Sequence, residues 1–127
     1  MAVANAIISI IDDDVAVRKS LESLLRSANF DVEGFGSAEE FLSSGGPVRA
    51  DCIISDIYMS GISGIELKRR LNADRCFTPF ILITGAVEDR LEELVKTVGV
   101  VSFLSKPVKV AVLLSAVGQA IRGSEKK

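Results

Sequence analysis

The chain has 127 residues, of which 48% are hydrophobic, and this composition suits one compact domain with a full core. Its 15 basic and 17 acidic residues leave a net charge of −2, which argues against direct nucleic-acid binding by this chain. Histidine is absent and the two cysteines form no Cys-x-x-Cys pair, which argues against a zinc site and excludes histidine-based catalysis.

Five apolar runs predict β-strands, and the first of them, at 6–11, is interrupted only by Ser9. The other runs lie at 31–34, 51–55, 79–83 and 100–104. Between the runs, amphipathic segments predict five helices. Apolar residues at helical spacing mark the first helix at Val17, Leu21, Leu24, Leu25 and Ala28, the fourth at Leu91, Leu94, Val95 and Val98, and the fifth at Val110, Leu113, Leu114, Val117, Ala120 and Ile121.

The second and third helices begin with a capping-box pattern, in which a serine is followed three residues later by a glutamate. The pairs are Ser37 with Glu40, and Ser63 with Glu66. Strict alternation of strands and helices with short connections predicts an α/β fold whose parallel sheet is covered on both faces. The segment 43–47 is expected to be a loop, and the polar residues 123–127 a frayed tail.

The chain also lacks the features of a membrane or secreted protein. No apolar run approaches the roughly 20 residues that span a bilayer, and the N-terminus has no basic region of the kind found in signal peptides. We therefore expect a cytoplasmic protein that does not bind membranes, with Cys52 and Cys76 as reduced thiols.

Polar residues follow four of the five predicted strands. Asp12 and Asp13 follow the first, Asp56 ends the third, Thr84 the fourth and Lys106 the fifth. Ligands of an open parallel sheet bind beyond the carboxyl ends of its strands, so these side chains are expected to converge on one site. Asp12 and Asp13 also have a simpler interpretation as solvated loop charges, and Asp14 is best interpreted as the cap of the first helix.

Three carboxylates in one place need a cation, because their mutual repulsion would otherwise raise the pKa of at least one of them. Oxygen ligands without histidine or cysteine favour Mg²⁺ or Mn²⁺ over zinc. A Mg²⁺ beside a carboxylate, a hydroxyl and an ammonium group suits phosphoryl transfer, in which a carboxylate acts as nucleophile and forms an aspartyl phosphate.

The sequence resembles the receiver domains of bacterial two-component response regulators, and most closely those of FixJ/NarL-type transcription regulators. The stretches "IDDDVAVRKSLESLL", "GSAEEFL" and "FLSKPV" carry this resemblance, together with the spacing of the polar residues. It implies a flavodoxin-like, doubly wound (βα)5 fold with a parallel five-stranded sheet in the order 2-1-3-4-5. The receiver domain would cover residues 1–122, and 123–127 would be a tail or the start of a linker.

The resemblance also implies a role for each polar residue. Asp56 would accept a phosphoryl group from a sensor histidine kinase, with Thr84 and Lys106 as its chemical partners. Mg²⁺ would be held by the acidic pair Asp12 and Asp13, by Asp56 and by the carbonyl of Tyr58. Phe103 would be the switch aromatic that moves together with Thr84, and the bond between Lys106 and Pro107 would be cis.

The implied function is a phosphorylation-activated signalling switch that catalyses only its own aspartyl phosphorylation and dephosphorylation. The face formed by the fourth helix, fifth strand and fifth helix would change and control an output, for which transcription is the expectation. A homodimer through that face and a C-terminal DNA-binding domain outside this chain are further expectations. The outer row Val108, Ala111 and Val112 of the fifth helix has the apolar character of a contact surface.

Two departures from the family pattern stand out: Ser60 replaces a common proline, which predicts a looser loop, and Val108 replaces a common phenylalanine. The ring of Tyr58 is expected to shield an aspartyl phosphate from water, whereas the small Ala86 would have the opposite effect. Two other functions remain open. They are a Mg²⁺-dependent phosphohydrolase of the haloacid-dehalogenase type, although Ala16 breaks its motif, and a receiver-like interaction module that works without phosphorylation.

Overall fold

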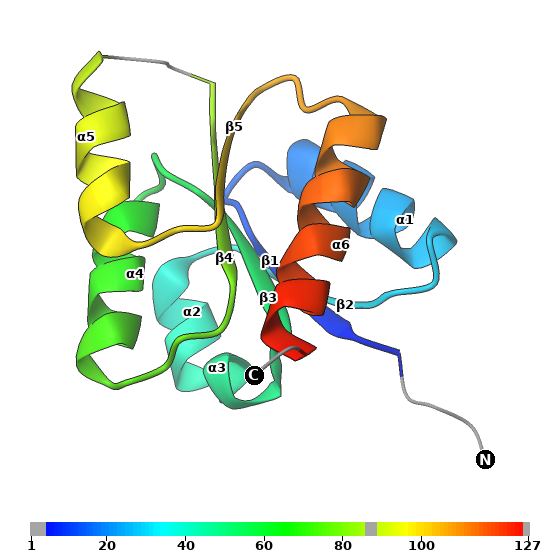
Figure 1. Ribbon diagram of the computed structural model, residues 1–127, viewed down its shortest axis with the longest axis horizontal. Helices are drawn as coiled ribbons and strands as arrows, with labels where there is room; N and C mark the ends of the chain where they lie inside the picture. Colours follow the sequence, from blue (N-terminus) through cyan, green and yellow to red (C-terminus); the bar gives the residue numbers. More distant parts are fainter. Residues whose placement is uncertain (1–4, 86–88, 126–127) are drawn as a thin grey trace.

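The computed structural model describes residues 5–85 and 89–125, and in this part of the chain five parallel strands form one sheet in the order β2-β1-β3-β4-β5 (Figure 1). The strands are β1 (Ile7–Ile11), β2 (Asp31–Phe35), β3 (Cys52–Asp56), β4 (Phe80–Thr84) and β5 (Ser102–Ser105). The predicted fold class and strand order are therefore confirmed, and the strand ends differ from the prediction by one or two residues.

Six helices connect or follow these strands in the described residues. They are α1 (Val15–Ser27), α2 (Ala38–Ser43), α3 (Gly46–Arg49), α4 (Gly64–Ala73), α5 (Asp89–Val98) and α6 (Val110–Glu125). The short helix α3 forms where the sequence predicted a loop, because Pro47 lies in its first turn, where its missing N–H leaves no bond unmade. The predicted fourth and fifth helices are therefore α5 and α6, and α6 continues through 123–125, which were expected to be frayed.

The helices cover both faces of the sheet and divide the core in two (Figure 1). Helices α1 and α6 pack on one face, and α2, α4 and α5 pack on the other. Neighbouring strand residues point to opposite faces, so Ile53 belongs to the core under α4 and Ile54 to the core under α1 and α6. A strand that is buried on both faces has apolar side chains at successive positions, and these continuous apolar runs predicted the central strands from the sequence.

Each predicted capping box forms only the hydrogen bond of its serine side chain. Ser37 accepts a hydrogen bond from the Glu40 N–H at 3.0 Å, and Ser63 accepts one from the Glu66 N–H at 3.1 Å. The glutamates do not return the bond to the serine N–H, because Glu40 accepts from Gly36 and Glu66 pairs with arginines one turn further along α4. Asp14 caps α1 as predicted, by accepting from two N–H groups of its first turn.

Two helix faces differ from the periodicity prediction. Val110 is 53% exposed and Leu94 is 41% exposed, although both belong to the apolar rows that marked their helices in the sequence. Helix α6 instead buries Leu113, Ala116, Val117 and Ala120. These residues follow the spacing i, i+3, i+4 and i+7, so the helix meets the sheet along a stripe that includes two small alanines. Of these four residues, only Ala116 was absent from the row that the spacing predicted.

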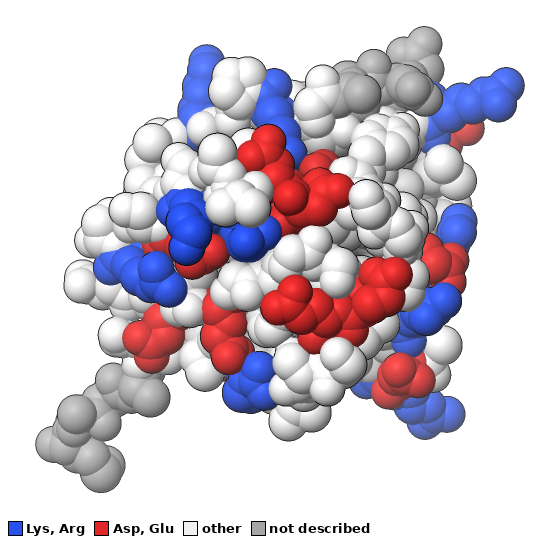
Figure 2. All heavy atoms as spheres, turned by 180° about the vertical axis from the view of Figure 1, so that it is seen from behind, with Lys and Arg blue, Asp and Glu red and all other residues white. Residues whose placement is uncertain are grey.

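Four further features complete the fold. The bond between Lys106 and Pro107 is cis, as expected from the resemblance, and Cys52 and Cys76 are free thiols. Burial raises the pKa of Cys52 to about 12, so this thiol stays protonated. Within 5–85 and 89–125, no helix is both long and apolar enough to cross a bilayer. On the face opposite to Figure 1, basic side chains lie dispersed among acidic clusters (Figure 2).

Candidate functional site

Three carboxylates lie together beyond the carboxyl ends of β1 and β3. Asp12 and Asp13 directly follow β1, and Asp56 is the last residue of β3. One carboxylate oxygen from each of the three lies within 4.8 Å of the other two. Asp12 and Asp56 are buried, with 0% and 7% of their surface exposed, whereas Asp13 faces solvent. The fold therefore brings together the acidic residues that the sequence singled out.

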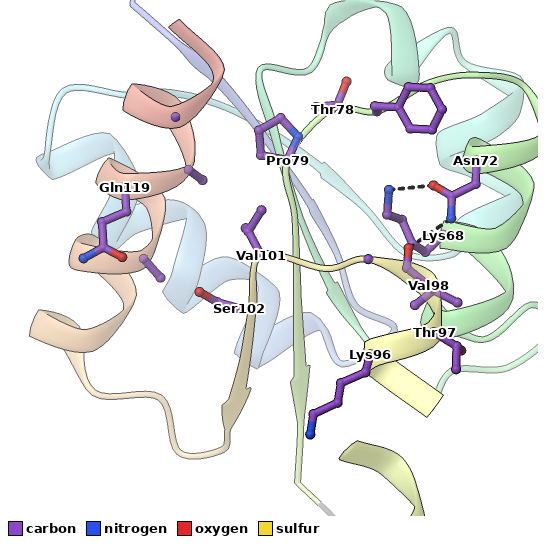
Figure 3. Close-up of a pocket in the computed structure, with 15 residues that line it drawn as sticks. Lys68, Asn72, Thr78, Pro79, Lys96, Thr97, Val98, Val101, Ser102 and Gln119 are labelled. Atoms are coloured by element: carbon purple, nitrogen blue, oxygen red, sulfur yellow. Dashed lines mark hydrogen bonds between the residues drawn. The ribbon is translucent and has the colours of Figure 1, made fainter. Parts of the chain in front are cut away.

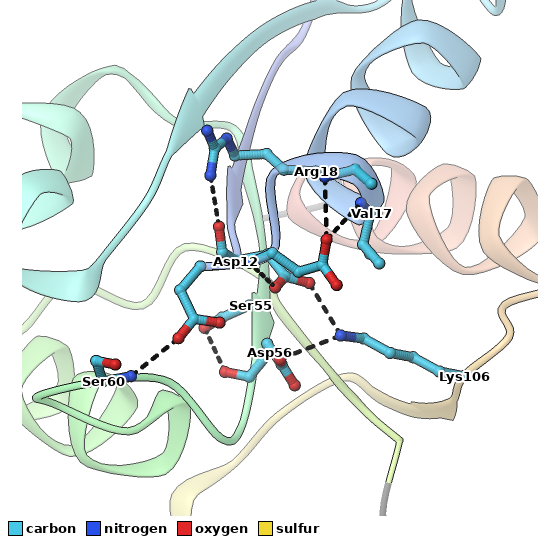
Figure 4. Close-up of polar contacts among 10 residues, drawn as sticks. Asp12, Val17, Arg18, Ser55, Asp56, Ser60 and Lys106 are labelled. Carbon is cyan, nitrogen blue, oxygen red and sulfur yellow. Dashed lines mark hydrogen bonds and ion pairs between the residues drawn. The ribbon is translucent and has the colours of Figure 1, made fainter.

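Lys106 joins two of these carboxylates from the loop between β5 and α6 (Figure 4). Its ammonium donates to Asp12 Oδ2 at 3.0 Å and to Asp56 Oδ2 at 3.1 Å. The three acidic groups and one ammonium leave the site with an excess of two negative charges. One divalent cation would neutralise this excess.

The proton affinities reflect this crowding. Burial, together with the charge of Asp12, raises the pKa of Asp56 above its ordinary value, although the hydrogen bond from Lys106 opposes the rise. Burial by itself would lower the pKa of Lys106, but its bonds to Asp12 and Asp56 outweigh burial and raise this pKa. Lys106 therefore stays charged, while the ionised form of Asp56 carries a desolvation penalty.

Backbone and side-chain bonds fix the two carboxylates that follow β1. Asp12 Oδ1 accepts from the Asp14 N–H at 2.9 Å, and the Arg18 guanidinium donates to the Asp12 carbonyl at 2.7 Å. Asp13 Oδ2 accepts from the Ser60 N–H at 3.1 Å, across the loop that follows β3. All three bonds are drawn in Figure 4. Each acidic side chain is thus oriented before any ligand arrives.

The loop between β3 and α4 passes close to the site, and two glycines permit this. At Gly61, φ is +82°, a left-handed conformation that favours glycine, and a Cβ there would also collide with the Glu39 carboxylate. A Cβ at Gly64 would collide with the carbonyl of Asp56. The start of α4 therefore lies directly against the end of β3.

The remaining predicted site residues lie around this cluster. Thr84 is buried at the end of β4, and its carbonyl accepts from the Lys106 N–H at 2.8 Å. Phe103 is partly buried on β5 and packs against the core under α4 and α5. Tyr58 follows β3 and is 49% exposed. Ala86, the other residue expected to affect the phosphate lifetime, lies outside the described residues.

Sequence reasoning missed two residues that orient the cluster. Arg18 lies on α1, pairs with the buried Glu22 and reaches the Asp12 carbonyl. Its signal in the sequence was a basic residue one turn into the helix that follows the acidic run. Ser60 was expected to loosen its loop, but its backbone N–H makes a bond to Asp13 that a proline cannot make. Only the pairing of two distant loops reveals this bond.

The donor set fits Mg²⁺. Carboxylate oxygens are the ligands that this hard cation prefers, and it retains several waters, so two or three carboxylates suffice. The convergence of Asp12, Asp13 and Asp56 supplies them, and the uncompensated negative charge of the site favours a cation.

Comparison with known proteins agrees with this geometry. A family model described as "Response regulator receiver domain" matches residues 8–118, which is most of the chain. The chain belongs to this family. The receiver domain is a signalling module, and its family is not one of known catalytic enzymes. The predicted family and the FixJ-type resemblance are both confirmed.

Individual relatives of this receiver domain support the same assignment. It is 35% identical over 126 residues to nodulation protein W of Bradyrhizobium diazoefficiens, and the match covers 99% of this chain and 56% of that protein. It is 40% identical over 110 residues to the transcriptional regulatory protein FixJ of Azorhizobium caulinodans, covering 87% of this chain and 52% of FixJ. The receiver domain thus spans about half the length of the curated relatives that it matches.

A solved structure gives the same result for the fold. The crystal structure of FixJ-N superposes on the receiver domain with a TM-score of 0.85 and 32% sequence identity. The match covers 94% of this chain and 96% of that one. The similarity therefore extends over essentially the whole domain.

Proposed function

We propose that this receiver domain is a phosphorylation-activated switch in a two-component phosphorelay and that it accepts its phosphoryl group on Asp56. The observation that carries the proposal is the position of Asp56 at a strand end, where one lysine bridges it to a second buried carboxylate. A sensor histidine kinase is the proposed donor. A cytoplasmic location follows from that partnership.

The chemistry is a simple displacement at phosphorus. A carboxylate oxygen of Asp56 attacks the phosphorus of a phosphohistidine, the new O–P bond forms, and the N–P electron pair leaves with the imidazole. The Lys106 ammonium, already 3.1 Å from Asp56 Oδ2, balances negative charge on the transferred phosphoryl oxygens. Mg²⁺ held by Asp12, Asp13, Asp56 and the Tyr58 carbonyl would supply further positive charge to those oxygens. Thr84 would donate a hydrogen bond to one of them.

Acetyl phosphate tests this function directly, because it supplies a phosphoryl group without a kinase. With Mg²⁺ present, we expect one label per chain, which peptide mapping assigns to Asp56, and no label when a chelator removes the metal. A label on Asp12 or Asp13 would contradict the assignment of the nucleophile. Labelling that persists in the chelator would contradict the assignment of the metal. The shielding role of Tyr58 stays a prediction.

Two other functions receive less support. The receiver-family match does not favour a haloacid-dehalogenase-type phosphohydrolase. An interaction module that works without phosphorylation has no need for a lysine that bridges two buried carboxylates. Full-length relatives include transcriptional regulatory proteins, so we propose that this domain acts on a C-terminal DNA-binding domain outside this chain.

The proposed output surface is the face formed by α5, β5 and α6. It corresponds to the fourth helix, fifth strand and fifth helix of the predicted fold, because the short helix α3 shifts the numbering by one. Val110 and Val112 on α6 are 53% and 45% exposed, and Leu94 on α5 is 41% exposed. Movement of Thr84 toward the phosphoryl group, followed by Phe103, would reshape this face by a population shift. The predicted outer row is only partly supported, since Val108 is half-buried.

Phosphorylation is expected to promote homodimer formation through this face. Beryllofluoride mimics an acyl phosphate when Mg²⁺ is present. Sedimentation velocity with both reagents should show a shift from monomer toward dimer. Val112→Glu should abolish the shift, because it places a charge on the face. Val48→Glu is the matched control, since Val48 is 91% exposed on α3, away from this face. An unchanged mass, or equal effects of both variants, would remove dimerisation through this face from the mechanism.

A further inference from the structure

A second polar feature lies at the opposite end of the sheet. A pocket of about 740 Å³ opens between the C-terminal parts of α4, α5 and α6, beside the residues that precede β4 and begin β5 (Figure 3). The acidic cluster lies beyond the carboxyl ends of the strands, so the two sites are separated by the length of the sheet. The proposed phosphoryl chemistry uses no residue of this pocket.

The pocket contains a buried lysine. Lys68 on α4 is only 4% exposed, and its ammonium donates to the Asn72 side-chain oxygen at 2.8 Å. Asn72 in turn donates to the Val98 carbonyl at 3.0 Å, which ties α4 to the end of α5. The rings of Phe77 and Phe80 lie with their centroids 6.0 Å from the ammonium, at the outer limit of a cation–π contact.

The charge of Lys68 is poorly compensated. An ammonium has three N–H donors, and within the described part of the chain one neutral amide oxygen accepts from it. Among the residues that the structure describes, no aspartate or glutamate lines the pocket, and none of their ion pairs involves Lys68. Lys96, the other lysine that lines the pocket, points away from Lys68 in Figure 3. Burial lowers the pKa of Lys68, as expected for a charge without an anionic partner.

We propose that this pocket binds a small organic carboxylate, whose anionic end pairs with Lys68 and whose apolar body lies against the pocket walls. The walls combine apolar side chains, including Phe77, Pro79 and Val101, with a similar number of polar ones, such as Ser102 and Gln119. Small-molecule sites are commonly cavities of this volume in which apolar walls surround a few oriented polar groups, and Lys68 is the buried charged group here. The proposal adds a ligand site to the receiver domain and does not depend on phosphorylation.

Benzoate is a suitable probe, because it joins one carboxylate to one ring, and benzamide is its neutral isostere. Titration of ¹⁵N-labelled protein should show saturable benzoate-induced shifts for the amides of Val98, Ser102 and Gln119. The Asp13 and Ser60 amides should not shift. Benzamide should bind about tenfold more weakly or worse, because it cannot form the ion pair. Equal binding of the two probes, or no shift with benzoate, would overturn the proposal.

Variants separate the ion pair from non-specific binding. Lys68→Met keeps an unbranched side chain without charge and should lower benzoate affinity at least tenfold. Lys19→Met removes an equal charge from the exposed face of α1 and should leave the affinity unchanged. Gln119→Trp fills the pocket from its exposed rim with Lys68 intact, so it tests the site even if Lys68→Met does not fold. Wild-type affinity in either pocket variant would contradict the assignment.

Discussion

Replacing Asp56 with asparagine is expected to abolish labelling by acetyl phosphate while raising the free energy of unfolding of the metal-free protein by about 1 kcal/mol. The loss of labelling follows because an amide cannot serve as the nucleophile. The gain follows because Asp56 is buried beside Asp12, and burial raises its pKa. Asparagine still offers an oxygen to Lys106, which then pairs with Asp12 alone.

The pH dependence of this stability difference is a second readout. Because the pKa of Asp56 is raised on folding, the folded state binds more protons than the unfolded state between the unfolded and folded values. Stability contributed by the protonated form is therefore lost as the pH rises through the folded pKa. Urea unfolding in the presence of a chelator should show a higher free energy of unfolding for Asp56→Asn than for the wild type at neutral pH. The difference should be smaller in acid. A variant that is less stable than the wild type, or that is still labelled, would contradict this account.

Lys106→Met is expected to have the opposite effect on stability, a loss of about 3 kcal/mol in the absence of metal, together with near-complete loss of labelling. The variant leaves Asp12 and Asp56 buried without the ammonium that lies 3.0 and 3.1 Å from their oxygens. Removing one partner of a buried ion pair costs more than the pair contributes, because the remaining charges have lost their solvation. Here two carboxylates are left.

Urea unfolding with and without Mg²⁺ measures this effect. Mg²⁺ should restore more stability to Lys106→Met than to the wild type, since the cation then replaces the missing positive charge. Lys109→Met is the matched control, because Lys109 is an exposed lysine three residues further along the same loop. We expect its stability to stay within about 0.5 kcal/mol of the wild type. Equal destabilisation by the two variants would show that Lys106 does not hold the site together.

Local signals in the sequence were reliable because they act over a few residues. Asp14, Ser37 and Ser63 cap their helices through N–H groups two or three positions away, and no distant contact is needed to predict such bonds. The continuous apolar runs that predicted buried parallel strands are also signals that lie within a few consecutive residues. Given parallel strands, the carboxyl ends must lie at one edge of the sheet, so Asp12, Asp56 and Lys106 could be assigned to one site.

The tertiary structure decided which groups actually touch. Lys106 meets Asp12 across 94 positions of sequence, and Ser60 meets Asp13 across 47, so both bonds depend on how β1, β3 and β5 are ordered in the sheet. The same packing buries Lys68, which stands in a run of three basic residues, and exposes Val110, although its spacing places it in the apolar row of α6. Hydrophobic periodicity records which face of a helix is apolar. Only the packed neighbours determine whether that face, or a charged one, is covered.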